Sequence, residues 1–138
     1  MLKSLTNVNV WVQDQDEALA FYTEKLGLEL REDVTVPEMG NFRWLSVGVP
    51  GQDVSIVLMA VPGPPVFDEE TSAKLKELVA KGAAGGLFFA TDDIDGAYDD
   101  LKGRGVEFSQ EPTEQPYGVD ACFRDPSGNQ MRVAQLND

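Results

Sequence analysis

The chain contains no histidine and only one cysteine, Cys122, among its 138 residues. Without histidine no Ser-His-Asp or Cys-His catalytic arrangement can form, and the imidazole that most catalytic divalent metals use as a ligand is missing. One cysteine cannot form an internal disulfide, which fits a reducing compartment, so the cytoplasm is the favoured location.

Positive charge is also scarce, because 11 Lys and Arg stand against 24 Asp and Glu and give a net charge of -13. Such a surface repels phosphate backbones and anionic lipids, so we expect neither nucleic acid nor a membrane as a partner. No apolar run approaches the roughly 20 residues that span a bilayer, and the N-terminus lacks the apolar core of a signal peptide. We therefore expect a soluble and unprocessed protein.

What the chain does have is an internal repeat. A strand-like run over 8–12 leads to Asp14 and a helical stretch that closes at Gly27, and a run over 87–91 leads in the same way to Asp93 and Gly105. Asp is a good N-cap and Gly a good helix C-terminus, so both helices carry start and stop signals. Three more strand-like runs follow each helix, and the chain therefore predicts two βαβββ units.

The expected strands cover 7–12, 28–34, 41–47 and 54–60 in the first unit and 87–91, 106–111, 119–124 and 130–135 in the second. In the first strand, alternation predicts a core face of Val8, Val10 and Val12 and an opposite face of Asn7, Asn9 and Trp11. The last two strands are joined by Asp-Pro-Ser-Gly-Asn, residues 125–129, whose composition is typical of a turn.

Between the units, Pro62-Gly63-Pro64-Pro65 excludes a helix or a central strand, and a short amphipathic helix with Leu75, Leu78 and Val79 follows. We expect one domain over 1–138 with an α+β fold. Module one covers about 1–61, the linker with its helix 62–83, and module two about 84–138. Each module contributes a curved mixed sheet to a cleft.

Three features together resemble the glyoxalase / bleomycin resistance protein / extradiol dioxygenase superfamily, also called the vicinal oxygen chelate superfamily. They are the paired βαβββ units with Asp-rich helix starts, the Phe21-Tyr22 pair in the first helix, and the sequence Phe-Arg-Asp-Pro-Ser-Gly-Asn over 123–129. The resemblance covers nearly the whole chain. It implies a glyoxalase-like fold and makes a homodimer plausible, with the cleft formed either within or between chains.

In the enzymes of that family, side chains from the first and last strands of the two units hold a divalent metal, typically through His, Gln or Glu. Carried over one at a time, these positions fall on Asn7, Gly86, Arg132 and, within one or two residues, Ser55. A glycine offers no side chain and a guanidinium no lone pair, so this set does not suit a catalytic metal. We expect no metal site and no cofactor.

Arg132 is the first candidate for ligand binding, because a guanidinium can bind a carboxylate, phosphate or enolate oxygen; an internal ion pair is the alternative. Asn7 and Asn9 offer amide groups to a ligand or to neighbouring polar groups. Trp11 and Trp44 could stack on a planar ligand, although aromatic strand residues are more often core. The remaining candidates are Ser55, Met59 and Phe88 in the lining, and Tyr117 in the loop between the sixth and seventh strands.

The resemblance and these residues together imply three functions, in decreasing order of preference. The first is a metal-independent small-molecule binding protein, for example one that sequesters an aromatic natural product or drug. The second is a metal-free isomerase, lyase or cyclase in which Arg132 stabilises an oxyanion and Tyr117 or Asp120 transfers a proton. The third is a metal-dependent lyase or dioxygenase. Whether the chain is an enzyme stays open at this point.

Overall fold

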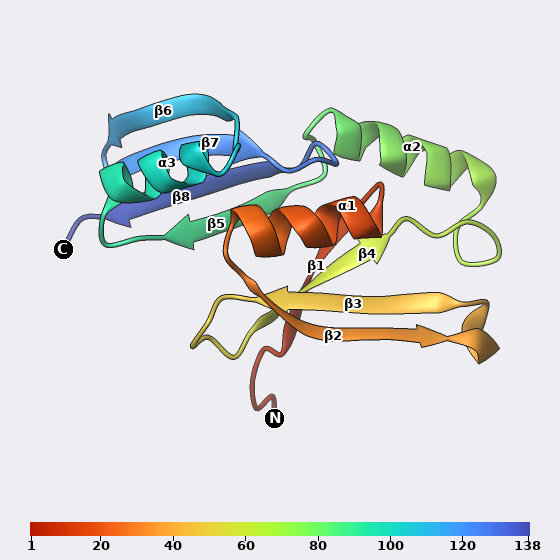
Figure 1. Cartoon of the computed structure of the whole chain (residues 1–138). Coiled ribbons are helices and arrows are strands. Elements are labelled where there is room, and N and C mark those ends of the chain that lie inside the picture. The colour runs from red at the N-terminus through yellow and green to blue at the C-terminus, as the bar shows by residue number, and fades with distance from the viewer.

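The computed structural model describes residues 1–138 and contains two four-stranded mixed sheets (Figure 1). Sheet one has the order β1-β4-β3-β2, and sheet two the order β5-β8-β7-β6. The pairs β1/β4 and β5/β8 are parallel, and all other neighbouring strands are antiparallel. The strands are β1 (Asn7–Val12), β2 (Glu29–Val36), β3 (Phe42–Gly48), β4 (Ser55–Ala60), β5 (Gly86–Ala90), β6 (Phe108–Gln115), β7 (Gly118–Arg124) and β8 (Gln130–Leu136). This topology confirms the two predicted βαβββ units.

Three α-helices accompany the sheets: α1 (Gln15–Ala20), α2 (Glu69–Ala80) and α3 (Ile94–Gly103). The N-caps of α1 and α3 are the predicted aspartates: Asp14 accepts a hydrogen bond from the backbone N–H of Glu17 and Asp93 from that of Gly96, both at 3.0 Å. A π-helical turn, η1 (Phe21–Lys25), extends α1, and a short 3-10 turn, η2 (Pro37–Met39), joins β2 to β3. No helix is long and apolar enough to cross a membrane.

The sixth strand is longer than the sequence predicted. The expected strand ends at about Glu111, just before Pro112, a residue that has no N–H to donate to a ladder. In the structure β6 continues to Gln115 and pairs with β7 again at Thr113. Pro112 lies within the register shift between Gln110 and Thr113 of an edge strand, which is where a sheet tolerates proline.

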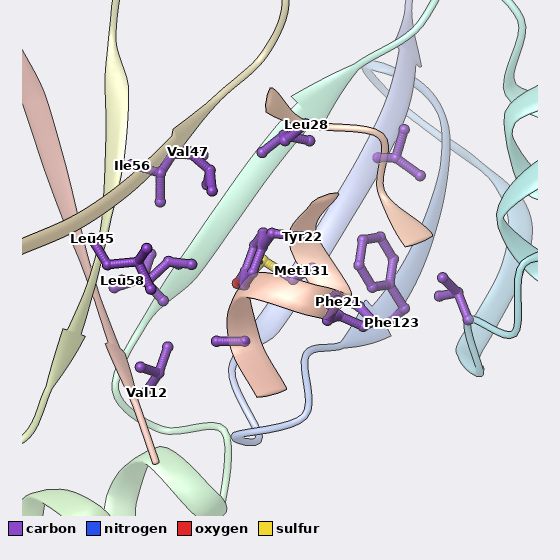
Figure 2. Packing of buried hydrophobic residues seen from close by; sticks show 14 of the residues in the cluster. Val12, Phe21, Tyr22, Leu28, Leu45, Val47, Ile56, Leu58, Phe123 and Met131 are labelled. Carbon is purple, nitrogen blue, oxygen red and sulfur yellow. The ribbon is translucent and has the colours of Figure 1, made fainter. Parts of the chain in front are cut away.

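The hydrophobic core lies between the two sheets and is shared by both modules. Figure 2 shows Phe21 and Tyr22 of η1 between the apolar residues of sheet one and Phe123 and Met131 of sheet two. On sheet one the core contains Val10, Val12, Leu45, Val47, Ile56 and Leu58, and on sheet two Ala121, Phe123, Met131 and Val133. Both sheets therefore turn their helix-covered faces towards each other and their opposite faces outwards.

The Asp-Pro-Ser-Gly-Asn turn joins the two modules rather than serving only as a strand connection. The Oδ1 atom of Asp125 accepts backbone N–H groups of Ser127 at 3.0 Å and Asn129 at 2.9 Å, as expected for this turn. Its Oδ2 accepts the hydroxyl of buried Tyr22 at 2.7 Å. The amide of Asn129 donates to the carbonyl oxygen of Trp11 at 2.7 Å. The motif therefore fixes the end of β1 and the first helix against module two.

Candidate functional site

The outward faces of the two sheets carry all the predicted ligand-binding side chains. We call them the sheet-one open face and the sheet-two open face. Because both sheets share one core on their inner sides, the two open faces point away from each other within one chain (Figure 1). Residues expected to line one cleft, such as Trp44 and Arg132, therefore lie on separate faces.

On the sheet-one open face, the register places the predicted residues in cross-strand pairs. Asn7 lies beside Ser55, and Trp11 beside Met59. Trp11 also packs against Phe67 of the linker, with ring centroids 5.9 Å apart. The amide of Asn7 donates only to the hydroxyl of Thr6. None of the six residues on this face that the sequence singled out, Asn7, Asn9, Trp11, Trp44, Ser55 and Met59, belongs to the buried core.

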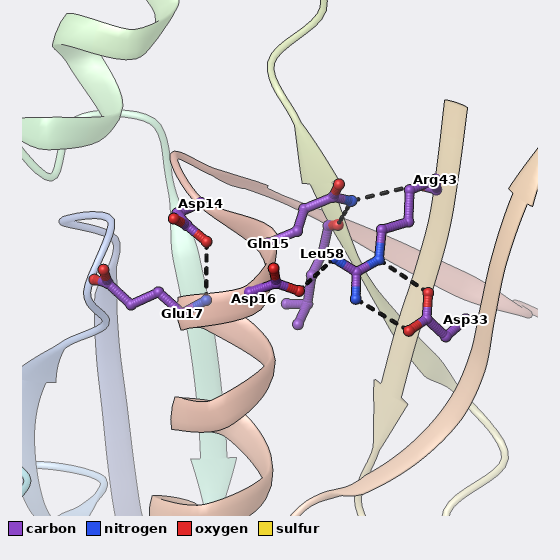
Figure 3. A network of polar contacts seen from close by, with 7 residues as sticks. All are labelled: Asp14, Gln15, Asp16, Glu17, Asp33, Arg43 and Leu58. Atoms are coloured by element: carbon purple, nitrogen blue, oxygen red, sulfur yellow. Dashed lines mark hydrogen bonds and ion pairs between the residues drawn. The ribbon is translucent and has the colours of Figure 1, made fainter. Parts of the chain in front are cut away.

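The pairing between β3 and β4 ends at Ser46 and Val57, and beyond this pair the two strands separate. There the amide of Gln15, from α1, donates to the carbonyl oxygens of Arg43 at 3.3 Å and Leu58 at 2.9 Å (Figure 3). Trp44 lies in this region, half-buried, and its indole N–H donates to the carboxylate of Glu32 at 3.2 Å. Trp44 is thus available to a ligand rather than part of the core.

On the helix side of this region, Arg43 links α1 to the edge of sheet one. Its guanidinium lies 2.9 Å from the carboxylate of Asp33 and 2.7 Å from that of Asp16 (Figure 3). The hydrogen bonds from Arg43 lower the pKa of Asp33. These contacts hold α1, β2 and β3 together and occupy the Arg43 guanidinium with two carboxylates.

A second arginine, Arg31, was not anticipated from the sequence. It occupies the bulge between Leu30 and Glu32, and its guanidinium donates to the carbonyl oxygens of Asp53 at 3.0 Å and Val49 at 2.9 Å, which hold the turn between β3 and β4. It also lies 3.3 Å from the carboxylate of Glu29 and 3.3 Å from the hydroxyl of Ser55. No local pattern marks a bulge arginine, so only the structure reveals this role.

On the sheet-two open face, one cross-strand row runs through Phe88, Arg132, Cys122 and Gln110. The Arg132 guanidinium lies over the Phe88 ring, 5.9 Å from its centroid. Phe88 is 54% exposed, so its ring lies at the surface and not in the core. A cavity of about 240 Å³ beside Arg132 is lined by Phe88, Cys122 and other residues of module two alone.

Arg132 is part of a polar network centred on a buried carboxylate. Its Nη1 donates to the hydroxyl oxygen of Tyr117 at 2.9 Å and lies 3.3 Å from Oδ2 of Asp120. The Tyr117 hydroxyl in turn donates to Asp120. Oδ1 of Asp120 accepts the amide of Gln110 at 2.8 Å and that of Gln115 at 3.4 Å. The ion pair that the sequence left as an alternative for Arg132 is therefore present.

These contacts set the protonation of the network. Burial raises the pKa of Asp120, but the hydrogen bonds from Tyr117 and the two glutamines, with the charge of Arg132, bring it below its usual value. The hydrogen bond to Asp120 raises the pKa of Tyr117, and the hydrogen bond to Tyr117 raises that of Arg132. At neutral pH the network thus contains a carboxylate, a neutral phenol and a guanidinium.

Of the residues in this network, Asp120 is marked by a local sequence pattern, but its glutamine partners are not. An acid within the apolar run 119–123 signals a buried carboxylate that needs partners, so Asp120 carries a readable signal. Gln110 and Gln115 are ordinary polar residues of an edge strand in sequence, and nothing local marks them. The register also refines the predicted quartet: Gly86 pairs with Gln130, whereas Arg132 pairs with Phe88, two residues further along.

The residues present do not fit a divalent metal. The chain has no group of three or more His, Cys, Asp or Glu side chains arranged to hold a metal ion. A side chain at Gly86 would overlap the backbone of Gln130, so no donor can replace it without a shift. On sheet one, Asn7 and Ser55 offer only neutral oxygens, which are weak ligands for transition metals.

The chain matches the family model of the Glyoxalase/Bleomycin resistance protein/Dioxygenase superfamily over residues 4–133. Among curated proteins it is 37% identical over 129 residues to YurT, an uncharacterised protein of Bacillus subtilis (strain 168), covering 92% of this chain and 94% of the relative.

Two solved structures share both the fold and a substantial part of the sequence. UcmS2 superimposes with a TM-score of 0.88 at 44% identity, covering 97% of this chain and 98% of its own. TnmS3, an antibiotic binding protein from Streptomyces sp. CB03234, superimposes with a TM-score of 0.75 at 31% identity, covering 99% of this chain and 98% of its own. The glyoxalase-like α+β fold expected from the sequence is confirmed.

Proposed function

The chain belongs to the Glyoxalase/Bleomycin resistance protein/Dioxygenase superfamily, and we propose that it binds a small flat molecule, such as an aromatic natural product or drug, without a metal ion. One observation carries this proposal: the aromatic residues Trp11, Trp44 and Phe88 lie outside the core, on the open faces, beside hydrogen-bonding groups. Aromatic side chains that are wholly or partly exposed in such positions are typical of ligand walls. The similarity to TnmS3, an antibiotic binding protein, supports the same function.

The complete cleft is formed by a homodimer, in which the sheet-one open face of one copy meets the sheet-two open face of the other. Within one chain these faces point apart, so neither has an opposite wall. A ligand held by one face alone would leave its other side in water, whereas ligand pockets usually enclose most of the ligand surface. A two-fold pair of chains would create two equal clefts.

A thermal-shift screen tests the binding function directly. The purified protein is heated with planar aromatic antibiotics and with glycopeptides, and a true ligand raises the melting temperature further with each increase in its concentration. Phe88→Ala should lose most of the shift, whereas Leu78→Ala, which removes an exposed apolar side chain from α2, should keep it. If no compound stabilises the protein, the binding proposal fails.

Mixing two defective variants tests the shared cleft. Trp44→Ala damages the sheet-one face and Arg132→Met the sheet-two face. In a mixed dimer with shared clefts, both defects fall into one cleft and the other cleft is intact. About a quarter of the sites should therefore recover after random mixing. If each cleft belongs to one chain, every cleft carries one defect and nothing recovers. Sedimentation gives the oligomeric state in parallel.

A metal-free isomerase, lyase or cyclase is the second candidate, and the Tyr117–Asp120–Arg132 network favours it over other enzymes. A guanidinium can stabilise an oxyanion, and a phenol hydrogen-bonded to a carboxylate can exchange a proton. Every compound that binds should therefore be incubated with the protein and analysed by mass spectrometry. Product that forms with the wild type but not with Arg132→Met would make the protein an enzyme; unaltered compounds would leave it a binding protein.

A further inference from the structure

The sheet-two open face carries a guanidinium without carrying a net positive charge. Arg132 Nη1 lies 3.3 Å from Oδ2 of Asp120, and the Asp120 side chain is 0% exposed. This carboxylate is held by the Tyr117 hydroxyl and by the amides of Gln110 and Gln115, so it cannot turn away from Arg132. Any ligand that approaches Arg132 meets both charges together.

The remaining charges on the open faces do not add a second cation to the cavity beside Arg132 either. On sheet one, Arg31 lies 3.3 Å from the Glu29 carboxylate and is occupied by turn carbonyls. The Glu32 carboxylate accepts only the indole of Trp44 and has no cation as a partner. At the end of sheet two, Arg124 donates to the carbonyl oxygen of Lys81 and has no carboxylate partner, but it does not line the cavity beside Arg132. With a net charge of -13 around them, the faces disfavour an anion.

Arg132 nevertheless keeps hydrogen-bond donors for a ligand. Its contacts in the structure use Nη1, which leaves Nε–H and Nη2–H₂ without acceptors, and the side chain is 43% exposed. Its guanidinium lies 5.9 Å from the Phe88 ring centroid, and the Tyr117 ring is 6.1 Å from the same centroid. A flat ring stacked on Phe88 therefore brings an acceptor at its edge within reach of the free donors.

We propose that Asp120 determines ligand specificity: by cancelling the charge of Arg132, it makes the site select neutral flat rings that carry a carbonyl-type acceptor and reject the corresponding carboxylates. This inference rests on the proposed binding function and concerns the ligand class of the same site. It replaces the expectation, drawn from Arg132 alone, that a carboxylate or phosphate is the natural partner. Asp120 acts through Arg132 as a positioning and charge-compensating residue and does not touch the ligand.

A matched pair of probes separates charge from shape. 2-Naphthamide and 2-naphthoate share the same ring and differ in one charge, and their affinities can be measured by calorimetry or by tryptophan fluorescence. The wild type should bind the amide about tenfold more tightly, roughly the effect of one unit charge at about 6 Å in a partly hydrated site. Asp120→Asn leaves Arg132 uncompensated, so naphthoate binding should improve about tenfold and the preference should vanish or reverse. Glu114→Gln, which removes an exposed charge from β6, is the control and should keep the wild-type ratio.

Arg132→Gln provides the reverse test, because it removes the guanidinium and keeps the Asp120 side chain. It keeps an amide donor but leaves Asp120 uncompensated, so naphthoate should weaken about tenfold and the amide less than about threefold. This variant decides the question if Asp120→Asn does not fold. Tighter binding of naphthoate by the wild type, or an unchanged ratio in a folded Asp120→Asn, overturns the inference while binding itself stands. If the wild type binds neither probe, the flat-ring binding function fails instead, and the inference with it.

Discussion

The hydrogen bond between Tyr22 and Asp125 gives a sharp test of how the two modules are held together. The hydroxyl of Tyr22 is the donor, at 2.7 Å, both residues are buried, and they are 103 positions apart in the chain. Tyr22→Phe keeps the ring in the core but leaves Oδ2 of Asp125 with the Asn129 amide alone. A hydrogen bond to a charged group is worth about 1.5–3 kcal/mol, so the free energy of unfolding should fall by that amount.

Urea unfolding at pH 7, followed by circular dichroism, measures this loss as a lower midpoint at an unchanged slope. The matched control is Tyr98→Phe, because the Tyr98 hydroxyl makes no hydrogen bond in the structure while its ring packs on Phe108, with centroids 4.5 Å apart. The control should lose less than about 0.5 kcal/mol. If Tyr22→Phe is as stable as the control, the buried contact does not hold the modules together and the reasoning is wrong.

The same pair predicts a pH dependence with a definite sign. Burial, followed by the charge of Asp125 and the hydrogen bond to it, raises the pKa of Tyr22 well above its ordinary value. Above about pH 10 an unfolded tyrosine loses its proton while the folded one retains it, so the unfolding free energy falls as pH rises. Tyr22→Phe lacks this term. The stability difference between wild type and variant should therefore be full below pH 10 and shrink above it, and a constant difference would refute the assignment.

Two further substitutions test local features. Gly86→Ala should destabilise the protein by more than about 2 kcal/mol, because the new Cβ would overlap the backbone of Gln130 on β8. Gly103→Ala is the control: it is helical, has nothing within 4 Å of the new Cβ, and should gain up to about 1 kcal/mol. Ser46→Ala should leave stability unchanged or raise it by about 1 kcal/mol in urea unfolding, because its buried hydroxyl has no partner. A clear loss would mean that this hydroxyl is paired in solution.

Features that depend on neighbouring residues could be predicted from the sequence. The caps at Asp14 and Asp93, the positive φ of Gly27 and Gly105 at the helix ends, and the turn at Asp125 each follow from local chemistry, and the structure has all of them. The internal repeat allowed these local predictions to be combined into two equivalent βαβββ units. Where the local rule had an exception, at Pro112 in an edge strand, the predicted boundary was wrong.

Features that depend on distant residues could not be predicted. The sequence indicated a turn at Asp125, but no local pattern says that its carboxylate meets Tyr22 across the core. The outward direction of the two open faces follows from that long-range packing, and therefore so does the separation of Trp44 from Arg132. The partners of Arg132 are set by register between β7 and β8, which places Cys122 beside it and Asp120 two pairs further on, on the same face.

The repeat distinguishes the core side of the molecule from the open side. On the core side, equivalent strand positions of the two modules are apolar in both, as with Val47 and Phe123 or Leu58 and Val133. On the open side, the row Asn9, Val57, Ser46 and Glu32 of sheet one corresponds to the row Phe88, Arg132, Cys122 and Gln110 of sheet two. The first row presents an amide and a carboxylate, the second an aromatic ring and a compensated guanidinium. Packing in the shared core explains why equivalent core positions are apolar in both modules. It does not explain why the equivalent positions on the two open faces differ in residue type. Two unlike walls that face each other in a dimer would give a flat ligand a single orientation, with its ring on Phe88 and its acceptor at Arg132.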